Sequence, residues 1–164
     1  MLSKALESAL NDQIKHEMYS AYFYLSMAAY CDAANMHGAA SWLALQSKEE
    51  QEHALKFYHY IQDRGGKVVL QAIDKPPTDF GSLLDVFEKV QQHELLVTGL
   101  INGLYELAVR ENDYPGQAML QWFINEQVEE EKNAAQIVDM LRMLGTQGAA
   151  LFMADAQLGR RARG

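Results

Sequence analysis

Apolar residues recur at steps of three and four along most of this chain, the spacing that places them on one face of an α-helix. The first such stretch covers residues 4–33 and the second covers residues 39–64, with a short turn at residues 35–38 between them. The second stretch stops at Gly65 and Gly66, where glycine can take the left-handed conformation that ends helices. We therefore expect two long helices joined by a tight turn.

The same spacing returns after a long connection, residues 65–81, which contains a Pro-Pro pair. Stretched at about 3.3 Å per residue, this connection can span roughly 55 Å, more than the roughly 40 Å length of the helix before it. It can therefore cross the whole molecule. We expect a third helix to follow, capped by a Ser82/Asp85 variant of the Ser/Thr-x-x-Glu capping box and ending near Arg110.

A fourth helix is expected between Asp113, a suitable N-cap, and Leu144, with Pro115 in its first turn. Residues 148–158 allow a short fifth helix, and residues 159–164 form a basic tail that we expect to be solvated. Four long helices joined by short, long and short connections predict an all-α four-helix bundle with a long crossover between helices 2 and 3. No strand pattern competes with it.

The inner face of each expected helix follows from its apolar spacing. In chain order the four faces are Leu6, Leu10, Gln13, Glu17, Ala21, Tyr24 and Ala28; Leu43, Glu50, His53, Phe57 and Ile61; Leu83, Phe87, Val90, Glu94, Val97, Ile101, Leu104 and Ala108; and Leu120, Phe123, Gln127, Glu130, Ala134, Ile137 and Leu141. The chain also carries a weak internal repeat, because Glu17 stands as far before Glu50 as Glu94 stands before Gln127. This supports a duplicated helical hairpin.

Polar residues interrupt these apolar faces near the midpoint of every long helix. They are Glu17, Glu50, His53, Glu94, Gln127 and Glu130. Burying one ion costs several kcal/mol and neighbouring carboxylates repel one another, yet no Lys or Arg occupies these inner positions. Bound cations would offset the cost, and shared protons or a water network are the alternative.

The pair Glu50 and His53 would be a weak signal alone, because a Glu and a His three apart are more often part of an ordinary helix with a satisfied core histidine. The signal becomes stronger because four carboxylates, one from each long helix, are expected at about the same height in the bundle. Oxygen ligands with a single imidazole favour iron, manganese or zinc over calcium or a thiolate-bound metal. Six or so protein ligand atoms suit two metal ions better than one.

Composition agrees with one domain over residues 1–164, with the bundle at about residues 4–144: the chain is 49% hydrophobic and 22% charged. No apolar run approaches the roughly 18 residues of a spanning helix, and the N-terminus lacks the apolar core of a signal peptide. A cytoplasmic location is the default expectation. The net charge of -8 favours cations over nucleic acid as partners. The single cysteine, Cys31, excludes an internal disulfide and is expected to be a buried filler.

Several stretches together resemble the ferritins, most closely the bacterial non-haem ferritins. They are residues 17–24, 49–53, 93–94 and 120–132. The resemblance covers nearly the whole chain and implies a ferritin-like four-helix bundle. It also implies that the protein oxidises Fe(II) to Fe(III) with dioxygen or hydrogen peroxide and stores a ferric mineral inside a hollow homo-oligomeric 24-mer shell.

Carried over residue by residue, the resemblance implies a di-iron ferroxidase centre. Glu17, Glu50 and His53 would bind the first iron, and Glu50, Glu94 and Glu130 the second. Glu50 would bridge the two ions. The protein would position the metals, while iron and oxygen carry the chemistry.

The resemblance also assigns residues around the centre. Tyr24 matches a family tyrosine that could hydrogen-bond a ligand or supply an electron to oxygen; a core aromatic with a satisfied hydroxyl is the equal alternative. Glu49, Glu126 and Glu129, with Glu130, resemble a third iron site. Their alternative interpretation is a solvated acidic face.

Two departures from related patterns change the expectations. Bacterioferritins repeat Glu-x-x-His in the second half of the chain, whereas this chain has Gln127 and Glu130, so metal at the second position should be held less permanently. Haem-binding members carry a methionine where this chain has Gln51, so haem is not expected.

Three classes of function stay open on the sequence. A storage ferritin should form a large shell that takes up many irons per chain. A di-iron oxidase acting on an organic substrate should hold two irons and no mineral. A purely structural helical protein should hold none.

Overall fold

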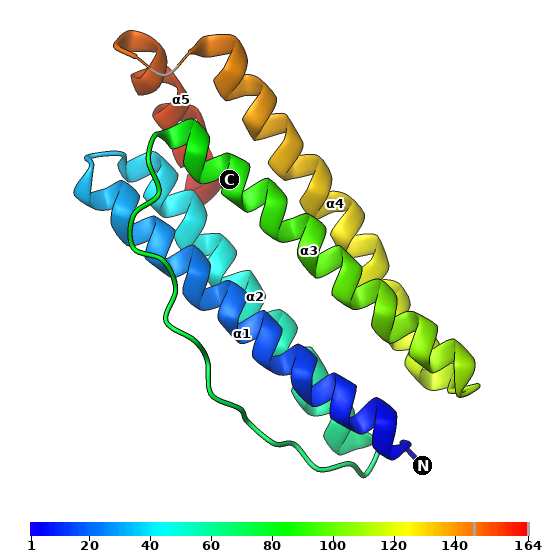
Figure 1. Cartoon of the computed structure of the whole chain (residues 1–164). Coiled ribbons are helices and arrows are strands. Elements are labelled where there is room, and N and C mark those ends of the chain that lie inside the picture. Colours follow the sequence, from blue (N-terminus) through cyan, green and yellow to red (C-terminus); the bar gives the residue numbers. More distant parts are fainter. Residues whose placement is uncertain (146, 164) are drawn as a thin grey trace.

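Four long helices lie side by side, and a short fifth helix crosses one end of them (Figure 1). The computed structural model describes residues 1–145 and 147–163. Its helices are α1 (Lys4–Ala33), α2 (His37–Asp63), α3 (Leu83–Arg110), α4 (Tyr114–Leu144), α5 (Ala149–Gly159) and the 3-10 helix η1 (Arg160–Arg163). The described part of the chain contains no strand. The predicted all-α four-helix bundle with a short fifth helix is confirmed.

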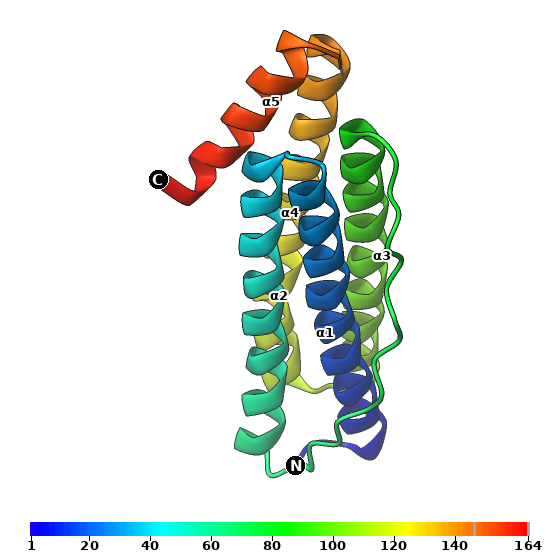
Figure 2. The same cartoon turned by 90° about the vertical axis from the view of Figure 1, so that its left-hand side faces the viewer.

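The connection between α2 and α3 runs along the bundle from one end to the other, beside α1 (Figures 1 and 2). Side chains of α1 hold it at several points. Asn11 donates to the carbonyl of Lys67 at 3.0 Å and accepts from the N–H of Val69 at 2.7 Å. Near the other end, the Tyr30 hydroxyl donates to the carbonyl of Gly81 at 2.7 Å. The expected crossover is therefore present and fastened to the first helix.

The helix ends follow the expected capping chemistry. Ser82 Oγ accepts from the N–H of Asp85 at 3.1 Å, and the Asp85 carboxylate accepts from the N–H of Ser82 at 2.7 Å, which completes a capping box. Asp113 accepts from the N–H of Gly116 at 2.7 Å. Gly65, just after α2, has a φ of 69°, the left-handed conformation that glycine tolerates.

Two details of the sequence prediction are wrong. Helix α2 begins at His37 and not at residue 39, because Asp155 of α5 accepts hydrogen bonds from two N–H groups in its first turn, as described below. On α4 the buried position is Val138, whereas Ile137 is only partly buried. Both residues are apolar, so the spacing could not decide between a step of three and a step of four.

Two apolar clusters fill the bundle, one on each side of the polar level. The cluster toward α5 includes Tyr24, Met27 and Leu43, and the other includes Leu10 and Phe57. Fully burying such a side chain stabilises a fold by about 1.5–3 kcal/mol. The two clusters can therefore hold the helices in register while the polar level between them is unfavourable.

Cys31 lies in the cluster toward α5 with none of its surface exposed, and burial raises the pKa of its thiol to about 11. This confirms a filler role for the cysteine. Across the residues that the structure describes, none of the helices combines the length and hydropathy that crossing a membrane would require.

Candidate metal centre

The polar residues expected on the inner faces do lie in the interior of the bundle. Each long helix contributes at least one of them, and all are no more than 6% exposed. They are Glu17 on α1, Glu50 and His53 on α2, Glu94 on α3, and Gln127 and Glu130 on α4. The structure therefore places every predicted di-iron residue in the core, between the two apolar clusters.

The half of this level contributed by α1 and α2 is a compact group of metal-binding atoms. Glu17, Glu50 and His53 each offer a ligand atom, and these atoms lie within 4.8 Å of one another. His53 Nδ1 is 3.4 Å from Glu50 Oε2 and 4.0 Å from Glu17 Oε2. The spacing suits a single ion bound by two carboxylates and an imidazole.

One atom of this group has no partner within the described structure. Gln13 Nε2 donates to Glu17 Oε1 at 2.8 Å, whereas the buried Glu17 Oε2 accepts no hydrogen bond. Leaving a buried acceptor unsatisfied costs about 1–3 kcal/mol, and more for a charged group. A cation bound between Glu17, Glu50 and His53 would supply the missing interaction.

The half contributed by α3 and α4 is held by neutral hydrogen-bond donors. Glu94 accepts from the Tyr24 hydroxyl and, at 3.2 Å, from Gln127 Nε2. Glu130 accepts from Gln46 Nε2 at 2.9 Å, and the same amide lies 3.3 Å from Glu50 Oε1. The carboxylates of this half are thus oriented by the protein, and Gln46 links them to the first half.

Burial and mutual repulsion favour the protonated form of these carboxyls and raise their pKa values. Burial, then the charge of Glu50, raises the pKa of Glu17 well above its usual range, and burial with the charge of Glu94 does the same for Glu50. Burial also raises the pKa of Glu94, and burial with the Glu94 charge raises the pKa of Glu130 to about 7. Protons and cations therefore compete for the same oxygens.

Tyr24 is fully buried, and its hydroxyl is satisfied by Glu94. Burial, followed by the charge of Glu94, raises the pKa of the phenol well above its usual range, so the side chain stays protonated. The hydrogen bond agrees with both interpretations made from the sequence. A role for Tyr24 in electron transfer stays a prediction.

The residues expected at a third iron site are not gathered as tightly. Within the described chain, the only group of three or more candidate ligands at single-ion spacing is Glu17, Glu50 and His53. Glu129 is exposed, Glu126 is half-buried, and the Glu49 side chain is 43% exposed. The third site stays a prediction.

The basic tail is not simply solvated, so that expectation is wrong for Arg161. Its guanidinium donates to Glu49 at 2.7 Å and to Gln46 at 2.9 Å, and it lies 4.4 Å from the centre of the Trp42 ring. No local sequence pattern predicts the contact between Arg161 and Glu49, which are 112 positions apart in the chain. Gly164 and the side chain of Arg163 lie outside the described part of the chain.

Sequence reasoning also missed the amides that orient the carboxylates. Gln13 stands four residues before Glu17, and Gln46 stands four residues before Glu50, so each amide lies one turn from a carboxylate on the same helix face. This repeated Gln-x-x-x-Glu spacing was the available signal. Groups that orient metal ligands are as much a part of a metal site as the ligands.

Comparison with known proteins agrees with this geometry. A family model described as a ferritin-like domain matches residues 7–144. The chain is 40% identical to the bacterial non-heme ferritin of Staphylococcus aureus over 161 residues, which are 98% of this chain and 97% of the relative. It is also 40% identical to a probable bacterial non-heme ferritin-like protein of Haemophilus influenzae, over 97% of this chain and 96% of the relative.

Solved structures show the same likeness. The chain superposes on an open pore ferritin from the hyperthermophilic archaeon Archaeoglobus fulgidus with a TM-score of 0.95 and 43% sequence identity. The match covers 97% of this chain and 98% of that one. An engineered closed form of the Archaeoglobus fulgidus ferritin matches equally well, with the same TM-score and identity.

Proposed function

This chain belongs to the ferritin family, and on that premise we propose that it oxidises Fe(II) to Fe(III) at its buried carboxylate centre and stores the product as a ferric mineral. The observation that carries the proposal is the group of Glu17, Glu50 and His53, with one unsatisfied carboxylate oxygen in the interior of the bundle. Iron is the substrate and the cargo of this reaction.

In the proposed reaction, Glu17, Glu50 and His53 bind the first Fe(II), and Glu50, Glu94 and Glu130 bind the second. Binding displaces the protons that the buried carboxyls hold. Two Fe(II) ions give up two electrons, which with two protons reduce one dioxygen to hydrogen peroxide or one hydrogen peroxide to two waters.

The surrounding residues keep the carboxylates in place during this exchange. Gln13 holds Glu17, Gln46 holds Glu130, and the Tyr24 hydroxyl holds Glu94. Such partners change metal affinity or activity by about 10–100-fold when they are lost. Glu49, Glu126 and Glu129 are proposed to bind a third iron with Glu130, outside the two-iron centre.

Storage requires an enclosed space, and we propose that copies of this chain form the 24-mer shell of the family. Large apolar side chains on the surface of the single chain support an assembly. Phe152 and Met153 of α5 are 77% and 59% exposed, and Leu70 of the crossover is 69% exposed. Contacts between copies would remove such surface from water.

The proposal is tested by anaerobic titration with Fe(II) followed by air, monitored by absorbance, with particle size measured in parallel. We expect two Fe(II) per chain to oxidise rapidly and many more to be retained in a large particle. A particle that retains only two irons per chain would favour a di-iron oxidase with an organic substrate. No iron binding would leave a structural helical protein.

A further inference from the structure

The C-terminal end of the chain docks onto the start of α2 through a close backbone contact. A Cβ atom on Gly38 would lie 1.9 Å from the carbonyl oxygen of Asp155, and one on Gly159 would lie 3.2 Å from the Cα of Gly38. The Asp155 carboxylate accepts from the N–H groups of Gly38 and Ala39 at 3.1 and 2.8 Å. The crossing thereby fixes where Arg161, two residues beyond Gly159, can reach.

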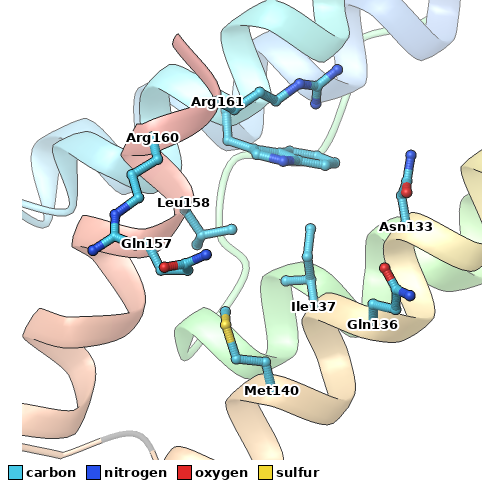
Figure 3. Close-up of a pocket in the computed structure, with 9 residues that line it drawn as sticks. Asn133, Gln136, Ile137, Met140, Gln157, Leu158, Arg160 and Arg161 are labelled. Atoms are coloured by element: carbon cyan, nitrogen blue, oxygen red, sulfur yellow. The ribbon is translucent and has the colours of Figure 1, made fainter. Parts of the chain in front are cut away.

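Arg161 extends from η1 toward α2, next to a pocket bordered by α5 and α4 (Figure 3). The neighbouring Arg160 points in a different direction (Figure 3). The Arg161 guanidinium donates to Gln46 Oε1 at 2.9 Å and to Glu49 Oε2 at 2.7 Å, and it lies over the Trp42 ring. One end-of-chain cation is thus held by three residues of α2.

The contact with Gln46 fixes the direction of a buried amide. Gln46 is 1% exposed, so its two polar atoms must find partners inside the protein. A guanidinium can only donate hydrogen bonds, so the amide oxygen has to face Arg161. The amide nitrogen then faces the centre, where it donates to Glu130 and Glu50. Arg161 therefore reaches two carboxylates of the centre through one side chain.

The contact with Glu49 places a positive charge beside a carboxylate that stands one residue before Glu50 of the centre. Arg161 occupies one oxygen of Glu49. An incoming cation that uses Glu49 must compete with this built-in cation.

We propose that Arg161 is a positioning residue of the metal centre: it directs the Gln46 amide toward Glu130 and Glu50, and it competes with a third metal ion for the Glu49 carboxylate. The inference rests on the proposed function and deepens it. A metal ion at the outer site releases the C-terminal segment from Glu49, and its departure lets Arg161 return.

Calorimetric titration of the full-length protein with Zn²⁺, a redox-inert probe, tests the inference. We expect the unchanged protein to bind two Zn²⁺ per chain and a third more weakly. In Arg161→Gln the third Zn²⁺ should bind roughly two- to five-fold more tightly, the size of a partly exposed ion pair. The matched control is Arg160→Gln, which removes the same charge one residue away and should leave the third affinity unchanged.

Two further variants separate competition from a loss of structure. Arg161→Lys keeps the charge and should return the third affinity toward that of the unchanged protein. With Glu49→Gln already present, Arg161→Gln should no longer tighten the third Zn²⁺, because the carboxylate for which Arg161 competes has been removed.

The results that would overturn the inference are distinct from those against the proposed function. A third affinity in Arg161→Gln that is equal to or weaker than in Arg160→Gln would overturn the inference alone. Faster hydrogen exchange of α5 with unchanged Zn²⁺ affinities would do the same, since a purely structural contact predicts it. Fewer than two Zn²⁺ per chain in the unchanged protein would overturn the proposed function and the inference with it.

Discussion

The two halves of the centre come from two helical hairpins, α1–α2 and α3–α4, and are built differently. In the first half, Glu17, Glu50 and His53 bring three ligand atoms within 4.8 Å, and Glu17 Oε2 has no hydrogen-bond partner among the described residues. Neutral donors hold carboxylates in both halves, but in the second half no fully buried carboxylate oxygen of the described residues is left without a partner. The first half is prepared for a cation, and the second is stabilised without one.

The glutamine on α4 at the position equivalent to Glu50 explains why the second half is less suited to a cation. Where α2 carries Glu50, α4 carries Gln127, whose amide nitrogen donates to both Glu94 Oε2 and the Glu94 carbonyl oxygen at 3.2 Å. An amide offers a neutral oxygen at most and here presents donors to a potential ligand. We therefore propose a tight first position and a second position that releases its metal more easily.

Removing a ligand from the first half should have the largest effect. Glu17→Ala or His53→Ala should slow the initial oxidation of Fe(II) by at least about 100-fold, since even the partners of metal ligands contribute 10–100-fold. The bundle should remain folded, because the two apolar clusters on either side of the polar level stay intact. Stopped-flow absorbance and thermal unfolding measure the two effects.

The control for these variants is Glu52→Ala, which removes an exposed carboxylate from the same run of residues. Its oxidation rate should match that of the unchanged protein. Rapid oxidation in both Glu17→Ala and His53→Ala would show that the first half is not the site of reaction.

The buried carboxyls also predict how stability depends on pH when no metal is bound. Their pKa values are raised above the ordinary value of 4.5, so the stability that protonation contributes is fully present below about pH 4.5 and is lost as the pH rises through each folded-state pKa, about 7 for Glu130. Burial lowers the pKa of His93 from 6.5 to about 4, so its contribution to stability rises with pH between these two values.

The loss of stability caused by the carboxyls should therefore be visible from about pH 6.5 upward, where His93 no longer opposes it. There the free energy of unfolding should fall by about 1.4 kcal/mol per pH unit for each carboxyl that is still protonated. Urea unfolding of chelator-treated protein measures it, and Glu17→Gln should remove one carboxyl's share of the slope. Saturating Zn²⁺ should weaken the dependence, because metal binding replaces the protons. A stability that is flat or rising over this range would contradict the assigned burial energetics.

Restoring symmetry between the halves should lengthen metal residence. In Gln127→Glu with Glu130→His, the second position gains an anionic ligand and exchanges a carboxylate for an imidazole, which should slow iron release by about 10-fold. The measurement is the fraction of ferric iron still at the centre minutes after two Fe(II) per chain are added, by Mössbauer spectroscopy. Equal or faster loss than in the unchanged protein would show that residues 127 and 130 do not control release.

The proposed third site should give the smallest effect. Glu49→Ala with Glu126→Ala should leave the rate of the first two-iron oxidation within about two-fold, because neither carboxylate belongs to the group of Glu17, Glu50 and His53, and partly exposed charges act weakly on the centre. The ratio of iron oxidised to oxygen consumed, or the recovery before a second turnover, should change. If both quantities match those of the unchanged protein, these residues form only a solvated acidic face.

Local chemistry explains why most of the fold could be predicted from the sequence. The capping box at Ser82 and the left-handed Gly65 depend on residues close in the chain, and the inner faces depend on helical spacing. The sequence could not show which of Ile137 and Val138 is buried, because two adjacent apolar residues fit the helical period equally well. The start of α2 at His37 was not predicted because the residue that stabilises it, Asp155, belongs to another helix.

The same distinction applies to the candidate centre. The buried polar residues could be singled out because carboxylates on apolar faces are unusual and share one level in four helices. Their assignment to two iron ions came from the resemblance to the ferritins and stays a prediction. Gln46 was not singled out, since a glutamine before a glutamate is common and its buried partner Glu130 lies on another helix. Arg161 was placed in solvent because a basic tail carries no sign of where it docks.

The asymmetry between the two halves is tested most directly by locating the first iron that binds. Crystals would be soaked anaerobically with less than one Fe(II) per chain, and anomalous diffraction at the iron edge would give the occupancy of each position. We expect a strong peak between Glu17, Glu50 and His53 and a much weaker one between Glu50, Glu94 and Glu130. Equal occupancy, or a stronger peak at the second position, would contradict a tighter first position.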